Sequence, residues 1–224
     1  MKRIPEPELM DSFEQAKAYA EADFKESNSL FVNLFHEKFK DATITGTVLD
    51  LGCGPADIPV RLARQFPQAE IHAVDGSEAM LFFAKIRIQK ELPEIQGRIK
   101  LIHALIPTDD LPLVKYNAII SNSLLHHLES PDSLWQTVKR YASKGAPVMI
   151  MDLMRPETRE VATMIVEKYS KNEPETLKRD FFNSLCAAYT PEEVREQLDR
   201  NGLHDLKVSQ VSDRHLLVFG RLFE

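Results

Sequence analysis

The order in which short apolar runs and helical patterns follow one another between residues 47 and 153 constrains the fold more than any other feature. The apolar runs predict strands, and the segments 58–66, 77–92 and 130–143 have the spacing and end signals of helices. The predicted strands are TVLDL (47–51), EIHAVD (70–75), IKLIHAL (99–105), YNAIISN (116–122) and APVMIMDL (146–153). Strands that alternate with helices favour a parallel sheet covered on both faces. The sequence therefore predicts an α/β fold.

The alternation ends after Leu153, and the rest of the chain predicts helices followed by a hairpin. Two helices are expected within 155–188, and a third begins at Thr190 with a capping box and ends near Gly202. Two antiparallel strands are then expected in LKVSQV (206–211) and HLLVFGRL (215–222). The expected fold is a doubly wound, mostly parallel seven-stranded sheet with a terminal antiparallel hairpin and helical cap segments.

The chain is expected to hold one main domain with two helical additions. Residues 8–40 have helical spacing, and we assign residues 1–43 to an N-terminal helical cap. The sheet domain follows over residues 44–224. Because the helices at about 155–189 are not needed to complete the sheet, we interpret them as a lid-like insertion over the mouth of a site.

Composition argues against several classes of protein. The formal net charge is −6 and no Lys/Arg-rich run occurs, so no nucleic-acid partner is expected. No membrane contact is expected, because no apolar run approaches the roughly 20 residues of a membrane helix and the chain start lacks a secretory signal's apolar core. Cys53 and Cys186 have neither metal-site nor disulfide-framework spacing, which favours a cytoplasmic protein without a bound metal. Nothing indicates an oligomeric state.

The segment VLDLGCGPADIPVRLA (48–63) places two glycines directly after the first predicted strand. Gly52 and Gly54 permit a tight turn and close approach of the backbone to a ligand. In open α/β sheets, ligands bind beyond the carboxyl ends of the strands, where this turn lies. A nicotinamide-dinucleotide motif would have its third glycine at position 57, which is instead Asp57, a possible helix cap. The pattern is not that of a phosphate loop either, so we do not expect a pyrophosphate cradle.

Two carboxylates accompany the turn. Asp50 precedes it and suits an amine-bearing ligand better than a pyrophosphate. Asp75 ends the next strand, where an acid binds ribose hydroxyls in doubly wound folds. The expected ligand has an ammonium group and a ribose but no phosphate, and S-adenosylmethionine meets these requirements.

Four segments, in order, resemble the motifs of the class I S-adenosylmethionine-dependent methyltransferases of the small-molecule type. VLDLGCGPA is similar to their first motif, IHAVDGSEAML to the second, YNAIISNSLLHHL to the fourth strand and PVMIMDL to the fifth. The resemblance covers residues 44–153 and implies methyl transfer from S-adenosylmethionine to a small-molecule acceptor, with S-adenosylhomocysteine as product. The alternative is a catalytically silent S-adenosylmethionine-binding module or regulatory protein.

The resemblance also implies which residues hold the cofactor. Gly52, Cys53 and Gly54 would line its methionine part. Asp50 would hold its amino group, and Asp75 would accept hydrogen bonds from its ribose. The remaining implied contacts, to ribose, adenine and sulfonium, are Gly76, Met80, Ala104, Leu105, Ser121 and Asn122.

One departure from the family concerns the adenine ring. Many relatives have Gly-Asp-Ala after the third strand, and its aspartate holds the adenine amino group. Here the run is His103, Ala104 and Leu105. Adenine is therefore expected to be held by backbone and apolar contacts, or by Asp109 from the following loop.

Methyl transfer is an in-line displacement in which the protein mainly aligns the reactants and excludes water. A general base helps only when the nucleophile carries a proton. His126 and His127 follow the fourth strand and are the candidates, each weighed against a structural role at a helix start. The fourth strand lacks the Pro-Pro-aromatic run of DNA-base amino methyltransferases and the acidic cluster of metal-dependent catechol-type enzymes.

Acceptor contacts are expected from the helical segments. Tyr19 and Asn183 lie in the two regions that would cover the site, as does Tyr189. Arg155 follows the fifth strand and would pair with a substrate carboxylate or phosphate, or else form a surface ion pair. Aromatic side chains in these regions suit a closed pocket for a small, partly apolar acceptor.

Overall fold

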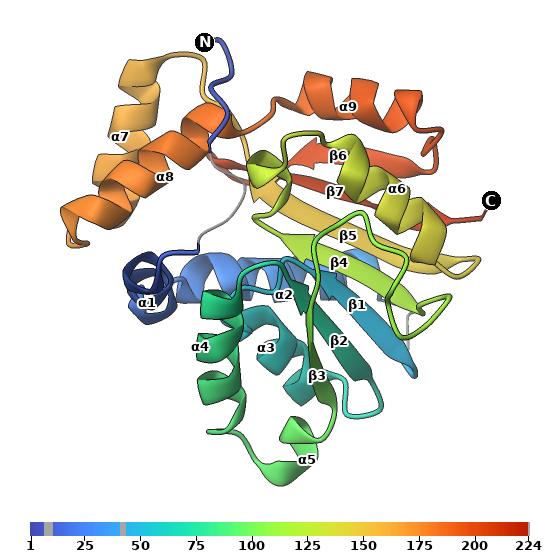
Figure 1. Ribbon diagram of the computed structural model, residues 1–224. Coiled ribbons are helices and arrows are strands. Elements are labelled where there is room, and N and C mark those ends of the chain that lie inside the picture. The colour runs from blue at the N-terminus through green and yellow to red at the C-terminus, as the bar shows by residue number, and fades with distance from the viewer. Residues whose placement is uncertain (7–10, 41–43, 224) are drawn as a thin grey trace.

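The computed structural model describes residues 1–6, 11–40 and 44–223. Within these ranges, seven strands form one sheet in the order β3-β2-β1-β4-β5-β7-β6 (Figure 1). The strands are β1 (Thr47–Leu51), β2 (Glu70–Asp75), β3 (Ile99–His103), β4 (Ala118–Asn122), β5 (Ala146–Leu153), β6 (Leu206–Gln210) and β7 (His215–Leu222). Strands β1 to β5 run parallel, and β7 is antiparallel to β5 and β6. The predicted sheet and its terminal hairpin are confirmed.

The central strands are apolar because both faces of the sheet are covered. Every residue of β1 and β5 is buried. One face packs against α6 (Asp132–Tyr141) and α9 (Pro191–Arg200), and the other packs against α2 (Lys25–Lys38) and α3 (Asp57–Gln65) (Figure 1). Since water reaches neither face, these strands need no alternation of polar and apolar residues.

Some boundaries differ from those predicted. β3 ends at His103, and β4 begins at Ala118. The helix expected over 77–92 is shorter, with α4 at Glu78–Ile88 followed by the short α5 at Pro93–Gln96. Such shifts at element ends are common, because helix and strand ends fray.

Capping residues set several helix starts. Ser77 begins α4 with its side chain, and Thr190 begins α9 with a full capping box. The prediction that Asp57 caps its helix is wrong. Helix α3 begins at Asp57 itself and follows Ala56, which has a left-handed φ of 62°.

The Asp57 carboxylate instead joins the N-terminal helices to the sheet domain. It pairs with Arg61 and, at 2.8 Å, with Arg87, and it accepts a hydrogen bond from the Asn28 amide at 2.9 Å. Arg87 also donates to the backbone oxygen of Ala20 at 3.3 Å. These contacts hold the last turn of α1 (Phe13–Glu21) and the first turn of α2 beside the glycine turn.

Three helices, α1, α7 (Arg159–Ser170) and α8 (Glu175–Ala187), lie at the edge of the sheet where the parallel strands end (Figure 1). Helix α1 packs against α4 and α8, and α7 packs against α8 (Figure 1). The first residues of the chain run beside the end of α8, where the Ile4 amide donates to the Cys186 carbonyl at 3.0 Å.

Parts of the predicted N-terminal cap are not covered. Residues 8–10 and the boundary predicted at residue 43 lie outside the described residues. Among the helices of the described ranges, none is both long and apolar enough to cross a bilayer.

Candidate active site

A cavity of about 400 Å³ opens at the carboxyl ends of β1, β2 and β4. This is the place in the sheet where the chain reverses its direction of strand addition, because β1 lies between β2 and β4. Most of the cofactor residues implied by the sequence line it: Asp50, Gly52, Cys53, Gly54, Asp75, Gly76, Met80, Ala104, Leu105 and Asn122. Residues more than 70 positions apart are thus brought together by the sheet alone.

The glycine turn requires glycine for two different reasons. Gly52 has φ of +73°, and a Cβ there would lie 2.9 Å from the Leu124 side chain. Gly54 has φ of +51°, but no atom lies within 4 Å of the position its Cβ would take. Gly52 therefore allows close packing against the segment after β4, whereas Gly54 leaves open space in the cavity wall.

This difference gives a prediction for the two glycines. Gly52→Ala is expected to lower the free energy of unfolding by about 1–3 kcal/mol, because the added methyl group overpacks against Leu124 in a strained backbone conformation. Gly54→Ala is expected to cost only about 1 kcal/mol of backbone strain. Urea unfolding of both variants measures the difference, and equal losses would contradict the steric argument.

Asp75 fits a ribose. Its Oδ2 accepts the Gly54 amide at 2.7 Å, and its Oδ1 accepts the Ser77 amide at 2.9 Å. These two bonds hold the carboxylate at the end of β2, and each oxygen keeps a further lone pair for a hydroxyl donor. Burial raises the pKa of Asp75, although both backbone amides and His103 act in the opposite direction.

Asp50 is a buried acid whose second oxygen has no partner. Its side chain is 1% exposed, and Oδ2 makes no hydrogen bond within the described part of the chain. Burial, followed by the charge of Asp75, raises the pKa of Asp50 to about 8. Asn122 Oδ1 is likewise buried without a hydrogen-bond partner among the described residues. Such acceptors fit an ammonium or another cationic group of a ligand.

Apolar residues form the part of the cavity beyond β3. Ala104, Leu105 and Ile106 line it, which agrees with apolar contacts to an adenine ring. Asp109, the alternative adenine ligand, pairs with Arg140 at 2.9 Å and does not line the cavity. The structure therefore favours the apolar alternative.

Ser121 is the one implied cofactor residue that the cavity lining does not include. Its hydroxyl is buried and donates to the Leu51 carbonyl at 2.7 Å. The expectation that it faces the sulfonium is wrong in this structure, because its side chain points away from the cavity and bonds to β1. Successive residues of a strand point in opposite directions, and it is the neighbouring Asn122 that lines the cavity.

A second cavity, of about 180 Å³, adjoins the first. The N-terminal helices and α7–α8 provide most of its wall, including the predicted Tyr19 and the aromatic Tyr169 and Phe181. Both cavities are lined by Tyr19, Ala22, Asp23, Phe24, Asn28, Asn122, Ser123 and His127. Burial, followed by the charge of Asp75, raises the pKa of Tyr19 to about 12, so its phenol stays protonated.

Three residues predicted to touch the acceptor line neither cavity. Arg155 is buried, donates to the Ala188 carbonyl at 2.9 Å and pairs with Glu193 at 2.5 Å. Tyr189 is buried beneath the Arg3 guanidinium, 4.1 Å from its ring centre. Asn183 is exposed on α8. Arg155 and Tyr189 therefore stabilise the junction of the helical segment with the sheet, and these predictions of substrate contact are corrected.

The two histidines after β4 lie in the short helix η1 (Leu125–His127) and differ in their environments. His126 is buried, and its Nδ1 lies 2.5 Å from Asp152 Oδ1. Burial opposes its charge, but the Asp152 and Glu6 carboxylates outweigh burial and raise the pKa of His126. His127 lines both cavities. His127 is thus the histidine that a bound acceptor could reach from either side.

Several lining residues had no signal in the sequence. Arg214 lines the second cavity with its guanidinium 3.3 Å from the centre of the Tyr169 ring. Glu6, which is not among the lining residues, approaches both histidines. Asn28 belongs to the wall common to both cavities. These residues come from the ends of the chain, and no local pattern relates them to the glycine turn.

A family model described as a methyltransferase domain matches residues 44–202, which is most of the chain. This chain belongs to the methyltransferase domain family. With its strand order, this methyltransferase is a member of class I, the S-adenosylmethionine-dependent enzymes. The match includes the cavity-lining turn, the strand end at Asp75 and the segment after β4.

Curated relatives share part of the methyltransferase. An uncharacterised methyltransferase of Mycobacterium tuberculosis is 29% identical over 130 residues, covering 57% of this chain and 62% of that protein. The malonyl-[acyl-carrier protein] O-methyltransferase of Bacillus cytotoxicus is 34% identical over 128 residues, covering 57% and 42%. The trans-aconitate 2-methyltransferase of Variovorax paradoxus is 32% identical over 116 residues, covering 52% and 40%. The matches therefore span about 40–62% of the length of these relatives.

Solved structures share the fold over nearly the whole chain. The plantazolicin methyltransferase BpumL in complex with SAH has a TM-score of 0.72 at 17% identity, covering 94% of this chain and 91% of that one. A putative S-adenosyl-L-methionine-dependent methyltransferase of Methanococcus maripaludis also has a TM-score of 0.72, at 16% identity, covering 99% and 98%. At these identities the likeness is one of fold.

Proposed function

We propose that this methyltransferase binds S-adenosylmethionine in the first cavity and transfers its methyl group to a small-molecule acceptor in the second, leaving S-adenosylhomocysteine. The observation that carries this proposal is the common wall of the two cavities, where Asn122, Ser123 and His127 border both. A donor and an acceptor bound on either side of this wall would meet there, as a displacement between two bound molecules requires.

The residues of the first cavity would hold the cofactor in parts. Asp75 would accept hydrogen bonds from the ribose hydroxyls, and Asp50 would hold the ammonium group with its unpartnered oxygen. Asn122 would direct its buried carbonyl oxygen towards the positive sulfonium. When bound, S-adenosylmethionine supplies a methyl group that is already activated by the charge on sulfur.

The rest of the site would align the acceptor and exclude water. Tyr19 and Phe24 pack together with ring centres 4.6 Å apart. Both rings line both cavities, where they would exclude water from the bound reactants. His127 is placed to take a proton from a hydroxyl or amine acceptor. An in-line path would run from the first cavity past Asn122 into the second.

The helical segments would act as covers of the acceptor site. The N-terminal cap, proposed for residues 1–43, and the insertion proposed for about 155–189 both supply lining residues of the second cavity. A small acceptor suits its volume of about 180 Å³. The relatives named for trans-aconitate and malonyl-[acyl-carrier protein] support a search among carboxylate-bearing acceptors. The free, buried cysteines support a cytoplasmic location.

Incubation with methyl-labelled S-adenosylmethionine and a cellular metabolite extract tests the proposal. Formation of S-adenosylhomocysteine together with a labelled small molecule supports an enzyme and identifies its acceptor. Tight binding of the cofactor without turnover in any extract would favour the silent binding module instead. Binding of NAD in place of S-adenosyl ligands would contradict the cofactor assignment.

A further prediction follows from the raised pKa of Asp50. At pH 7 a carboxyl with a pKa of about 8 is mostly protonated, and an ammonium ligand favours its ionised form. Binding of S-adenosylhomocysteine at pH 7 is therefore expected to release about one proton, and binding tightens as the pH rises from 6 towards 8.

Calorimetry in phosphate and in Tris measures this release, because the two buffers take up the proton with different heats. Asp50→Asn should abolish the release while the protein remains folded. A binding heat that is the same in both buffers for the unmodified protein would contradict the proposed role of Asp50.

A further inference from the structure

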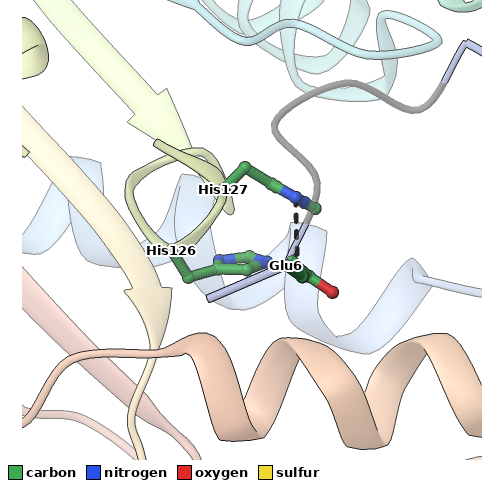
Figure 2. Close-up of side chains that lie close together, drawn as sticks. All are labelled: Glu6, His126 and His127. Carbon is green, nitrogen blue, oxygen red and sulfur yellow. Dashed lines mark ion pairs between the residues drawn. The ribbon is translucent and has the colours of Figure 1, made fainter. Parts of the chain in front are cut away.

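We propose that Glu6, His126 and His127 form a site for a divalent transition-metal ion of the zinc type at the edge of the second cavity. The three side chains come from the first residues of the chain and from η1, and Figure 2 shows them converging. One possible ligand atom from each lies within 4.8 Å of the other two. Because Glu6 lies about 120 positions before the two adjacent histidines, no spacing motif in the sequence reveals the set.

The distances fit coordination better than direct hydrogen bonding. Glu6 Oε1 lies 3.5 Å from His126 Nε2 and 3.3 Å from His127 Nδ1. A charge-assisted hydrogen bond would bring such atoms to about 2.7–2.9 Å. Tetrahedral ligands with bonds of about 2.0–2.1 Å to zinc lie roughly 3.3–3.4 Å from one another.

The surrounding contacts orient two of the ligands. His126 Nδ1 faces Asp152 Oδ1 at 2.5 Å, which places the proton on Nδ1 and leaves the Nε2 lone pair facing Glu6. A carboxylate bonded to the far nitrogen of a ligating histidine is the usual support of a metal site. Ser184 Oγ donates to Glu6 Oε1 at 2.9 Å and holds that carboxylate in place.

The local charge also favours a cation. Glu6 and Asp152 place two carboxylates against the largely buried His126 ring. The nearby Arg3 guanidinium bonds to backbone oxygens, with Nε 2.6 Å from the Ala187 carbonyl and Nη2 3.1 Å from that of His126, rather than to either carboxylate. A divalent ion between Glu6 and the histidines would offset these charges.

Three protein ligands leave a coordination position that can face the second cavity, which His126, His127 and Ser184 line. On the basis of the proposed function, the acceptor's oxygen, nitrogen or sulfur would take this position. The metal would lower the pKa of that atom, so that its proton passes to solvent, and with the metal bound His127 would act as a ligand instead of as the base. The lone pair of the acceptor atom would then bond to the methyl carbon as the carbon–sulfur bond breaks, with its electron pair left on sulfur.

The test is metal binding by the full-length, chelator-treated protein. Calorimetric titration with Zn²⁺ is expected to show one site, and Co²⁺ is expected to give the visible absorption of a tetrahedral centre. Glu6→Gln and His127→Gln should each weaken Zn²⁺ binding by at least about 100-fold. His204→Gln is the matched control, since His204 forms an exposed pair with Asp199 at 3.4 Å, and this variant should bind Zn²⁺ like the unmodified protein.

Two measurements keep the outcome decisive. Thermal unfolding without metal and S-adenosylhomocysteine binding report whether each variant folds. If the unmodified protein binds the cofactor but no Zn²⁺, the metal site is overturned and the proposed function stays intact. Zn²⁺ affinity that is equal in Glu6→Gln and unmodified protein would overturn it as well. So would nitrogen NMR that shows His126 doubly protonated and unchanged by Zn²⁺, because a proton would then occupy the position assigned to the metal.

Discussion

Replacing Asp75 by alanine is expected to weaken binding of S-adenosylhomocysteine by about 100-fold or more. Two hydrogen bonds from ribose hydroxyls to a carboxylate contribute about 1.5–3 kcal/mol each, and about 1.4 kcal/mol corresponds to tenfold in affinity. The same substitution leaves the amides of Gly54 and Ser77 without their acceptor, which loosens the glycine turn. Calorimetric titration measures the effect.

Asp109→Ala is the control for this prediction. Asp109 lies in the loop beyond β3, is exposed and pairs with Arg140, so its removal should leave cofactor affinity unchanged. The circular dichroism spectra of both variants should match that of the unmodified protein. A folded Asp75→Ala variant with unchanged affinity would refute the ribose assignment.

The largest loss of stability is expected for Asp152→Ala. This carboxylate is 1% exposed and accepts the amides of Leu125 and Leu153, each at 2.7 Å, besides facing His126. Its removal leaves buried donors without partners, and breaking a buried pair of this kind costs about 3–5 kcal/mol. Urea unfolding should show this loss as a lower transition midpoint.

Asp213→Ala provides the comparison. Asp213 also accepts from a cation and a hydroxyl, with Lys168 at 2.7 Å and Tyr169 at 2.8 Å, but it lies at the surface. An exposed pair contributes about 0–1 kcal/mol, so its loss should be small. Equal losses in the two variants would show that burial of Asp152 does not determine its contribution.

The cofactor side of the site could be predicted because a parallel sheet relates sequence to space directly. Asp50 and Asp75 each lie at or near the carboxyl end of an apolar strand, and parallel strands end at one edge. Once the strands are recognised, their ends must lie close together. The glycine turn adds a local backbone requirement that is visible in the sequence at Gly52 and Gly54.

The acceptor side could not be predicted in the same way. Arg155 follows β5 just as Asp75 ends β2, yet its side chain turns to Glu193 and the Ala188 carbonyl. Whether a residue beyond a strand faces the cavity depends on the path of the next segment, which tertiary packing sets. Glu6 is the extreme case, because only the folded chain brings the N-terminal segment to the histidines of η1.

The wall that Tyr19 and Phe24 contribute to both cavities has a kinetic consequence. If donor and acceptor bind in the two cavities as proposed, one pair of helices would border both molecules, and the two sites would not open independently. An acceptor bound against this wall keeps the helices closed over the donor. Turnover is therefore expected to be ordered, with the donor entering first, S-adenosylhomocysteine leaving last, and the opening of α1 and α2 limiting the rate.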